Sequence, residues 1–322
     1  IHNFIRIFEL GPSCRKQLKM SEKAFSPLQP AKPKRPPSQL KTAIRGSGLI
    51  ASIRDDLTLS SWLIIGGLLQ GIAMLALGYF SLIPPALVMF YRIGDNLLMA
   101  AGLTKNRYLD GVVMTKFGAQ IPREDGTFGS KPAEQSVVVF LIGAKCSHPF
   151  GMLAPGWMKL NESFISMALK LEASPDSGLL GTSSWINNGV DASSNAGLTL
   201  MYFRDYESLY KFAHGPKHMA GVHWWTQIVK THPHLGIYHE TYEVPKGSWE
   251  NVYINIKPTG ISATVYPIRS PEGNGEIEWV SPVVDARKGP LRTAAGRFQR
   301  DGLRQDDSEE IWDQTVVDYG MA

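Results

Sequence analysis

Histidine is concentrated in one short stretch of this sequence. Six of the eight histidines lie between His214 and His239. A neutral imidazole can accept a proton near neutral pH or bind a metal ion, so chemistry is expected here first. His214 and His218 are four residues apart, but Gly215-Pro216 interrupts a helix between them, and no third ligand stands at zinc-like spacing. The spacing therefore predicts no metal site.

The surroundings of these histidines differ. A helix is expected from Pro216, because proline is favoured in a first helical turn. His218 and Trp225 share one face of that helix, so both are candidates to point inward. His232 and His234 flank Pro233 in an expected loop, and we expect both to be solvated.

A second polar group follows from two strands expected over 236–244 and 250–256. Alternate residues of a strand point to opposite faces. His239 therefore lies on one face of its strand and Tyr238 on the other. One face of the last strand carries an aromatic and amide set suited to a substrate cavity: Trp249, Asn251, Tyr253 and Asn255. Polar groups on a covered face are costly unless they are satisfied or used, so the set indicates either a cavity or a hydrogen-bonded network in a dimer interface.

Several cofactor sites are missing from the sequence. No Gly-x-Gly-x-x-Gly follows an expected strand, so a flavin- or nicotinamide-binding Rossmann unit is excluded. No Gly-x-Ser-x-Gly elbow is present either. Cys14 and Cys146 do not lie in loops that resemble a haem-thiolate site. The net charge of +4 is mild and gives no reason to expect nucleic acid as a partner.

The elements that must position these residues follow a β-α-β-β-α-β order. Alternating or β-branched runs predict strands, and apolar residues at helical spacing predict helices between them. We therefore expect an α+β, ferredoxin-like domain in which helices cover one face of an antiparallel sheet. The strand over 137–142 is apolar on both faces. Its second face must also be covered, either by a second copy of the domain in a dimeric α/β barrel or by the membrane segment.

Upstream of the domain lies a long uncharged run. No charged residue occurs from Leu57 to Tyr91, which is long enough to span a bilayer. Pro84-Pro85 breaks the run, so one span, two spans and a re-entrant hairpin all remain open. The positive-inside rule places the basic tail in the cytosol. The expected organisation is a basic disordered tail over 1–56, a membrane segment over 57–103, a linker over 104–134, the α/β-barrel domain over 135–268 and a polar acidic tail over 269–322.

Three stretches resemble a known family: 236–245 (Gly-Ile-Tyr-His-Glu-Thr-Tyr-Glu-Val-Pro), 249–255 (Trp-Glu-Asn-Val-Tyr-Ile-Asn) and 203–209 (Phe-Arg-Asp-Tyr-Glu-Ser-Leu). They look like a bacterial and fungal family of dimeric α/β-barrel proteins that is similar to antibiotic-biosynthesis monooxygenases. Its fungal members with membrane-spanning N-termini resemble oxygenases of secondary-metabolite clusters, including the fumagillin cluster. The resemblance covers residues 136–268.

The resemblance implies a membrane-associated monooxygenase, in the endoplasmic reticulum, that oxidises a lipophilic terpenoid or polyketide intermediate and forms a homodimer. Cofactor-free oxygenases of this fold deprotonate an electron-rich substrate. His239 would then be the base, with Asn251 and Tyr253 as partners, and Tyr238 and Trp225 would line the cavity. Some members of the wider superfamily bind haem, so His218 or His239 as a haem ligand is the alternative. A membrane-anchored carrier of lipophilic ligands, or a scaffold, is the non-catalytic alternative.

Overall fold

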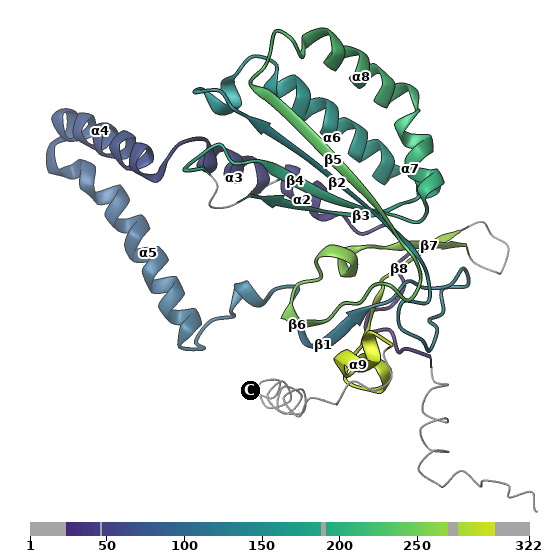
Figure 1. Ribbon diagram of the computed structural model, residues 1–322. Coiled ribbons are helices and arrows are strands. Elements are labelled where there is room, and N and C mark those ends of the chain that lie inside the picture. Colours follow the sequence, from purple (N-terminus) through teal and green to yellow (C-terminus); the bar gives the residue numbers. More distant parts are fainter. Residues whose placement is uncertain (1–23, 46, 188–190, 270–275, 300–322) are drawn as a thin grey trace, which may run out of the picture.

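The computed structural model describes residues 24–45, 47–187, 191–269 and 276–299 (Figure 1). Its main unit is a four-stranded antiparallel sheet in the order β3-β4-β2-β5, with helices on one side. This strand order with β-α-β-β-α-β connections is ferredoxin-like and confirms the expected fold. The elements in chain order are β2 (Val137–Cys146), α6 (Trp157–Ala173), β3 (Leu179–Ile186), β4 (Gly197–Phe203), α7 (Tyr206–Ala213), α8 (Pro216–Ile228) and β5 (Leu235–Val244).

Local sequence explains where the two helices after β4 begin. The side chain of Asp205 caps α7 by accepting a hydrogen bond from the backbone N of Ser208 at 2.7 Å. Gly215 and Pro216 then end that helix and begin α8, because proline lacks a backbone donor and is tolerated only in a first turn. The helical crossover between β4 and β5 is therefore split into two short helices.

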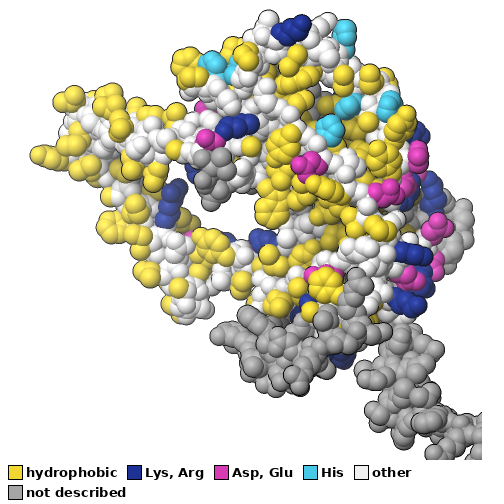
Figure 2. Space-filling model, viewed as in Figure 1, with side chains coloured by type: hydrophobic (Ala, Val, Ile, Leu, Met, Phe, Trp, Pro, Cys, Tyr) yellow, Lys and Arg dark blue, Asp and Glu magenta, His cyan; other side chains and the backbone are white. Residues whose placement is uncertain are grey.

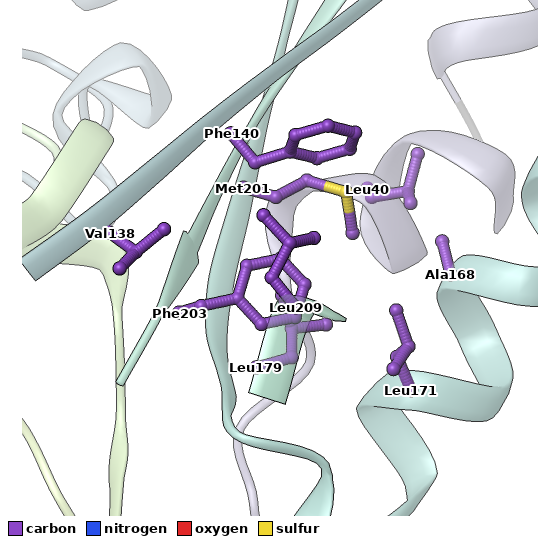
Figure 3. Packing of buried hydrophobic residues seen from close by; sticks show 9 residues of the cluster. All are labelled: Leu40, Val138, Phe140, Ala168, Leu171, Leu179, Met201, Phe203 and Leu209. Carbon is purple, nitrogen blue, oxygen red and sulfur yellow. The ribbon is translucent and has the colours of Figure 1, made fainter. Parts of the chain in front are cut away.

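The main core lies between the sheet and these helices. Val138 and Phe140 of β2 pack with Phe203 of β4 and with Leu171 of α6 (Figure 3). Leu40 also belongs to this core, although it comes from the N-terminal segment. Alternate residues of β2 therefore face the helices, and the intervening ones face the opposite side of the sheet.

Two further small sheets pack beside this unit. One has the order β6-β1-β9, with β1 (Val113–Ala119), β6 (Tyr253–Ile256) and β9 (Val283–Asp285). The other pairs β7 (Tyr266–Arg269) with β8 (Ile277–Val280), and a short helix α9 (Ala294–Arg297) follows. Short 3-10 helices join these parts: η2 (Arg107–Leu109), η3 (Gly151–Leu153), η4 (Pro175–Ser177), η5 (Gly260–Ala263) and η6 (Gly289–Leu291).

These sheets correct two expected boundaries. Residues 104–134 are not a simple linker, because β1 lies within them and Phe117 and Ala119 are fully buried. The acidic tail expected over 269–322 holds β8, β9 and α9 in its described part, and Val283 and Val284 are fully buried. Residues 300–322 lie outside the described residues. β1 and β9 are short strands that pair with each other from distant parts of the sequence, so composition alone does not reveal them.

The basic N-terminal segment also needs correction. Residues 1–23 lie outside the described residues, but 24–37 run along the β7–β8 and β9 strands with bridges between Pro27 and Val284 and between Lys32 and Trp279. We call residues 24–37 the strap. Helices α2 (Gln39–Arg45) and α3 (Ser47–Asp56) follow it. Because Leu40 is buried in the main core, this segment is an integral part of the fold and not a disordered tail.

A helical arm leaves the folded unit after α3. It consists of α4 (Leu59–Leu77), the 3-10 turn η1 (Gly78–Leu82) and α5 (Ile83–Ala100), and it projects from the rest of the chain (Figure 1). No residue of α4 is buried, and hydrophobic side chains cover the arm (Figure 2). By length and composition, the stretch Leu59–Ala100 is apolar enough to cross a membrane. Asp95 of α5 forms an ion pair with Arg107 of η2.

The second face of the main sheet is covered in part by the chain itself. Val137 and Val139 of β2 pack with Ile261 and with Tyr253 of β6. Leu141 and the residues beyond it on this face have no such cover, and Tyr238 and Tyr242 of β5 remain about half exposed. The apolar second face of β2 is therefore explained by an intramolecular contact at one end only.

Candidate functional site

His239 lies on the helix-covered side of the sheet. It is the cross-strand partner of Ile142, and its ring lies 5.6 Å from the ring of Phe140. Both neighbours face the main core, so His239 faces the same side. It remains exposed, because β5 is an edge strand and only its terminal residues, Leu235 and Val244, are even partly buried. His239 is therefore a proton acceptor that a substrate could reach.

His218 points toward the core from α8. Its ring lies 5.3 Å from the ring of Phe212, which packs on the main core. Among the described residues, its Nδ1 atom is buried and finds no hydrogen-bond partner. No side chain of α8 is fully buried, so this helix leaves β5 uncovered. We call His218 and His239, which lie against Phe212 and Phe140 on this side of the sheet, the histidine edge.

Trp225 marks the end of α8 nearest the start of β5. It packs on a separate cluster made by Cys146 at the end of β2, Ala154, and Leu235 at the start of β5. Cys146 is a free buried thiol that donates a hydrogen bond to the Gly151 carbonyl at 3.1 Å. Burial raises the pKa of the Cys146 thiol, so this cysteine is a packing residue and not a nucleophile.

The structure does not bring Asn251 and Tyr253 to His239. The Asn251 side chain accepts a hydrogen bond from the Ala119 backbone N at 2.6 Å and donates one to the Ala119 carbonyl at 3.0 Å. The Tyr253 ring stacks on Phe117 of β1 with centroids 5.0 Å apart. Both residues join β1 on the opposite face of the main sheet, because β6 pairs with β1 and not with β5.

The other expected cavity residues also lie apart. Trp249 donates from its indole nitrogen to the Gln135 carbonyl at 2.8 Å and packs with the Tyr253 group. Asn255 is exposed and has a left-handed backbone with φ of 48°. Tyr238 faces away from the helices and lies directly over Gly143, where an added Cβ would come within 2.3 Å of its ring. Of the expected site residues, His239, His218 and Trp225 share the helix-covered side.

Three tyrosines lie where the sheets meet: Tyr202 of β4 in the main sheet, Tyr253 of β6 and Tyr266 of β7. Burial raises the pKa of Tyr202 to about 12. Burial likewise raises the pKa of Tyr253 and of Tyr266. These phenols therefore remain protonated at neutral pH and do not act as bases.

Two surface hollows lie away from the histidine edge. One, of about 590 Å³, lies between Glu134 and Lys246, and the other, of about 190 Å³, lies beneath the strap. Neither hollow includes His218 or His239. The larger is open and polar, and it is formed by a turn, so it lacks the apolar walls that a lipophilic ligand requires.

Sequence reasoning missed a buried polar network at the strap. Arg35 donates to the carbonyls of Glu172 and Leu179 at 2.8 and 2.7 Å and stacks on Trp279. The Glu172 carboxylate accepts hydrogen bonds from the backbone N and the hydroxyl of Ser38, each at 2.9 Å. Burial lowers the pKa of Arg35. A basic residue within a proline-rich stretch gave no sign of this role, because its partners lie more than 130 residues away.

The fold and the family comparisons together define the class. Residues 137–261 match the family described as Monooxygenase af470-like. The chain is 33% identical over 251 residues to Monooxygenase af470 of Aspergillus fumigatus, covering 77% of this chain and 89% of that protein. The protein is thus a monooxygenase built on a ferredoxin-like domain. It belongs to the Monooxygenase af470-like family.

Two of the similar solved structures match this chain over about a third of its length. SnoaB, a cofactor-independent oxygenase from Streptomyces nogalater, is 11% identical with a TM-score of 0.24, covering 33% of this chain and 90% of that chain. A DABB-family protein with a ferredoxin-like fold from Mesorhizobium loti is 14% identical with a TM-score of 0.23, covering 34% of this chain and 96% of that chain.

Proposed function

We propose that this monooxygenase is membrane-associated and oxidises a lipophilic secondary-metabolite intermediate, a terpenoid or a polyketide, at the histidine edge. The observation that carries the proposal is that His218 and His239 lie on the same, helix-covered side of the sheet. His239 belongs to β5, which α8 leaves exposed, and His218 points inward from α8. His239 is exposed and free to accept a proton, whereas the His218 Nδ1 atom is buried without a partner among the described residues. A buried unpaired nitrogen is costly unless a ligand uses it.

The chemistry needs no resident cofactor when the substrate itself supplies all four electrons that reduce O₂. His239 would remove a proton from an acidic CH₂ group, and the resulting carbanion would reduce O₂. One oxygen atom then remains on carbon as a carbonyl group, and the other leaves as water, so CH₂ and O₂ give C=O and H₂O. Asn251 and Tyr253 are not partners of the base in this reaction, because both side chains contact β1.

Haem is the second candidate because of one specific atom. Histidine is an axial ligand of haem iron in many proteins, and the Nδ1 atom of His218 is buried without a hydrogen-bond partner among the described residues. If haem is bound, the purified protein will show a Soret band that His218→Ala removes. A colourless, active protein supports the cofactor-free reaction.

The arm supports the membrane part of the proposal. Leu40, before the arm, and Val138, after it, share one hydrophobic core, so both ends of Leu59–Ala100 must lie on the same side of a bilayer. We therefore propose that the arm enters the membrane as a hairpin or a re-entrant loop and does not cross once. By the positive-inside rule, the basic N-terminal residues support a cytosolic catalytic domain, and we propose the endoplasmic reticulum as its membrane.

We also propose a homodimer, formed through a smaller part of the second sheet face than the sequence indicated. The chain covers only one end of the second sheet face, and the rest presents exposed or half-buried side chains: Leu141, Trp185, Leu198, Leu200, Tyr238 and Tyr242. Such a patch on one face of an open sheet suits the same patch of a second copy.

The catalytic proposal is tested in the native host. Cells carrying His239→Ala are compared with cells lacking the gene, and lipophilic metabolites are followed by mass spectrometry under ¹⁸O₂. Loss of a general base typically costs about 100- to 10,000-fold in rate, so His239→Ala should reproduce the profile of the deletion. His223→Ala, which removes an exposed histidine of α8, is the control and should retain the product with one ¹⁸O atom. Normal product formation in His239→Ala would remove His239 from the mechanism.

A further inference from the structure

One end of the catalytic domain carries large apolar side chains with no cover. Phe150 and Leu153 at η3 and Met158 in the first turn of α6 are 69%, 84% and 58% exposed. They lie next to each other in sequence and at the same end of the sheet as the start of β5, because Cys146 packs with Leu235. We call Phe150, Leu153 and Met158 the apolar tip.

The apolar tip is fastened to the last residue of α3. The Asp56 carboxylate accepts a hydrogen bond from the Met152 backbone N at 2.7 Å. Gly151, with φ of 47°, lets that carboxylate approach, because a Cβ at this position would lie 1.7 Å from the Asp56 oxygen. The position and the conformation both require glycine.

The neighbouring residue fastens a second loop at this end. The Asp55 carboxylate accepts from the backbone N of Asn195 at 2.7 Å and from its side-chain amide at 3.0 Å. The Asp55 carbonyl accepts from the Ser194 backbone N at 2.6 Å. The end of α3 is therefore fixed to the domain on both sides, and the direction in which the arm leaves is fixed with it.

The arm begins within a few residues of this clamp. Leu59 is the first residue of α4, three residues after Asp56, and three residues span at most about 10 Å. The Trp62 indole donates to the Arg54 carbonyl at 3.0 Å, which ties the first turn of α4 back to α3. Tryptophan is enriched at the membrane–water interface, so this indole marks the level at which the arm enters lipid.

We infer that the apolar tip inserts into the interfacial layer of the same bilayer that holds the arm. This inference rests on the proposed membrane hairpin. The lipid surface is the partner that fits, because the tip is fixed close to the point where an uncovered apolar helix begins. The tip also adjoins the Trp225 cluster at the end of α8, so a substrate dissolved in lipid reaches the open side of the sheet without crossing water.

The test measures depth in the membrane with the full chain in phosphatidylcholine vesicles. An environment-sensitive fluorophore is attached to Leu153→Cys, or to Phe150→Cys as a second site, in a Cys14→Ser background where Cys146 is buried. Quenching by lipids that carry a nitroxide at either a shallow or a deep position is then compared with two controls. Leu69→Cys lies in the middle of α4, and Lys246→Cys follows β5 at the far end of the domain.

The inference predicts strong quenching and a blue-shifted emission at both tip sites and at Leu69→Cys, with neither effect at Lys246→Cys. Strong quenching at Leu69→Cys without quenching at either tip site would overturn the inference and leave the membrane hairpin intact. Absence of quenching at Leu69→Cys would instead refute the hairpin itself, and the inference with it.

Discussion

Asn251 shows at the level of one residue how a polar side chain can look catalytic and be structural. Both ends of its amide bond the backbone of Ala119, so it holds the turn before β6 against β1. A substrate could not use the amide without breaking this contact. The hydrogen-bonding capacity that suggested a cavity is already satisfied.

Asn251→Ala should therefore lower stability and leave chemistry intact. Leaving the Ala119 groups unpaired costs about 1–3 kcal/mol of unfolding free energy, measured by urea unfolding in detergent. Asn255→Gly is the control, because the left-handed backbone at Asn255 suits glycine. Unchanged stability together with lost turnover in Asn251→Ala would return this residue to the active site.

The tyrosines between the sheets give a pH prediction. Tyr202 has a pKa of about 12 in the folded chain and about 10 when unfolded. The stability that the protonated Tyr202 phenol contributes to the folded chain is fully present below pH 10. As the pH rises toward 12, the free energy of unfolding falls by at most about 1.4 kcal/mol per pH unit. Tyr202→Phe should flatten the alkaline fall in stability over this window, measured by thermal unfolding, whereas Tyr210→Phe, an exposed tyrosine, should not. Equal alkaline slopes in wild type and Tyr202→Phe would contradict the assignment.

The strap shows at the level of elements how a proline-rich basic segment becomes part of a core. Arg35 donates to one backbone carbonyl at the end of α6 and to another at the start of β3. Ser38 then binds the Glu172 carboxylate, and Leu40 enters the main core two residues later. The strap thus connects the arm's folded base to the catalytic domain.

Arg35→Ala should destabilise the chain by about 1.5–3 kcal/mol, since hydrogen bonds to charged groups have this size. Lys34→Ala next to it should have little effect, because Lys34 is exposed. The two variants are compared by their urea midpoints in the same detergent. Similar midpoints for both would show that the strap adds nothing to stability.

The arm carries the prediction on membrane attachment. The full chain should stay in the membrane fraction through high salt and alkaline carbonate, because α4 has no buried residue and no charge. Replacing Leu59–Ala100 by a flexible Gly/Ser linker should release a folded protein, since the strap and α2 remain to complete the core. Recovery of the unaltered chain in the soluble fraction would count decisively against a membrane hairpin.

The uncovered part of the second face of the main sheet predicts the oligomeric state of the protein. The detergent-solubilised chain should have the mass of a homodimer by light scattering, with the detergent contribution subtracted. Leu141→Asp should shift it to monomer, because a charge on the uncovered face opposes burial against a second copy. Met219→Asp, on the exposed side of α8, should remain dimeric. A folded wild-type monomer at micromolar concentration would exclude the dimer.

Sequence alone determined the parts that depend on local periodicity. Alternation and helical spacing predicted the β-α-β-β-α-β order, the opposite faces of β5 on which His239 and Tyr238 lie, and the inward face of α8 with His218 and Trp225. The uncharged run likewise identified the arm. These patterns are readable because each is repeated within one element.

Tertiary structure alone decided which distant segments meet. The last strand follows β5 in the sequence, but β6 pairs with β1, more than 130 residues away, and Asn251 and Tyr253 therefore lie on the opposite face from His239. Leu40 and Arg35 lie before the arm yet complete a core built after it. Long-range pairing depends on which surfaces fit, and no local pattern records that fit. Short motifs therefore indicate which residues could do chemistry, and the tertiary structure determines which of these residues lie close enough to act together.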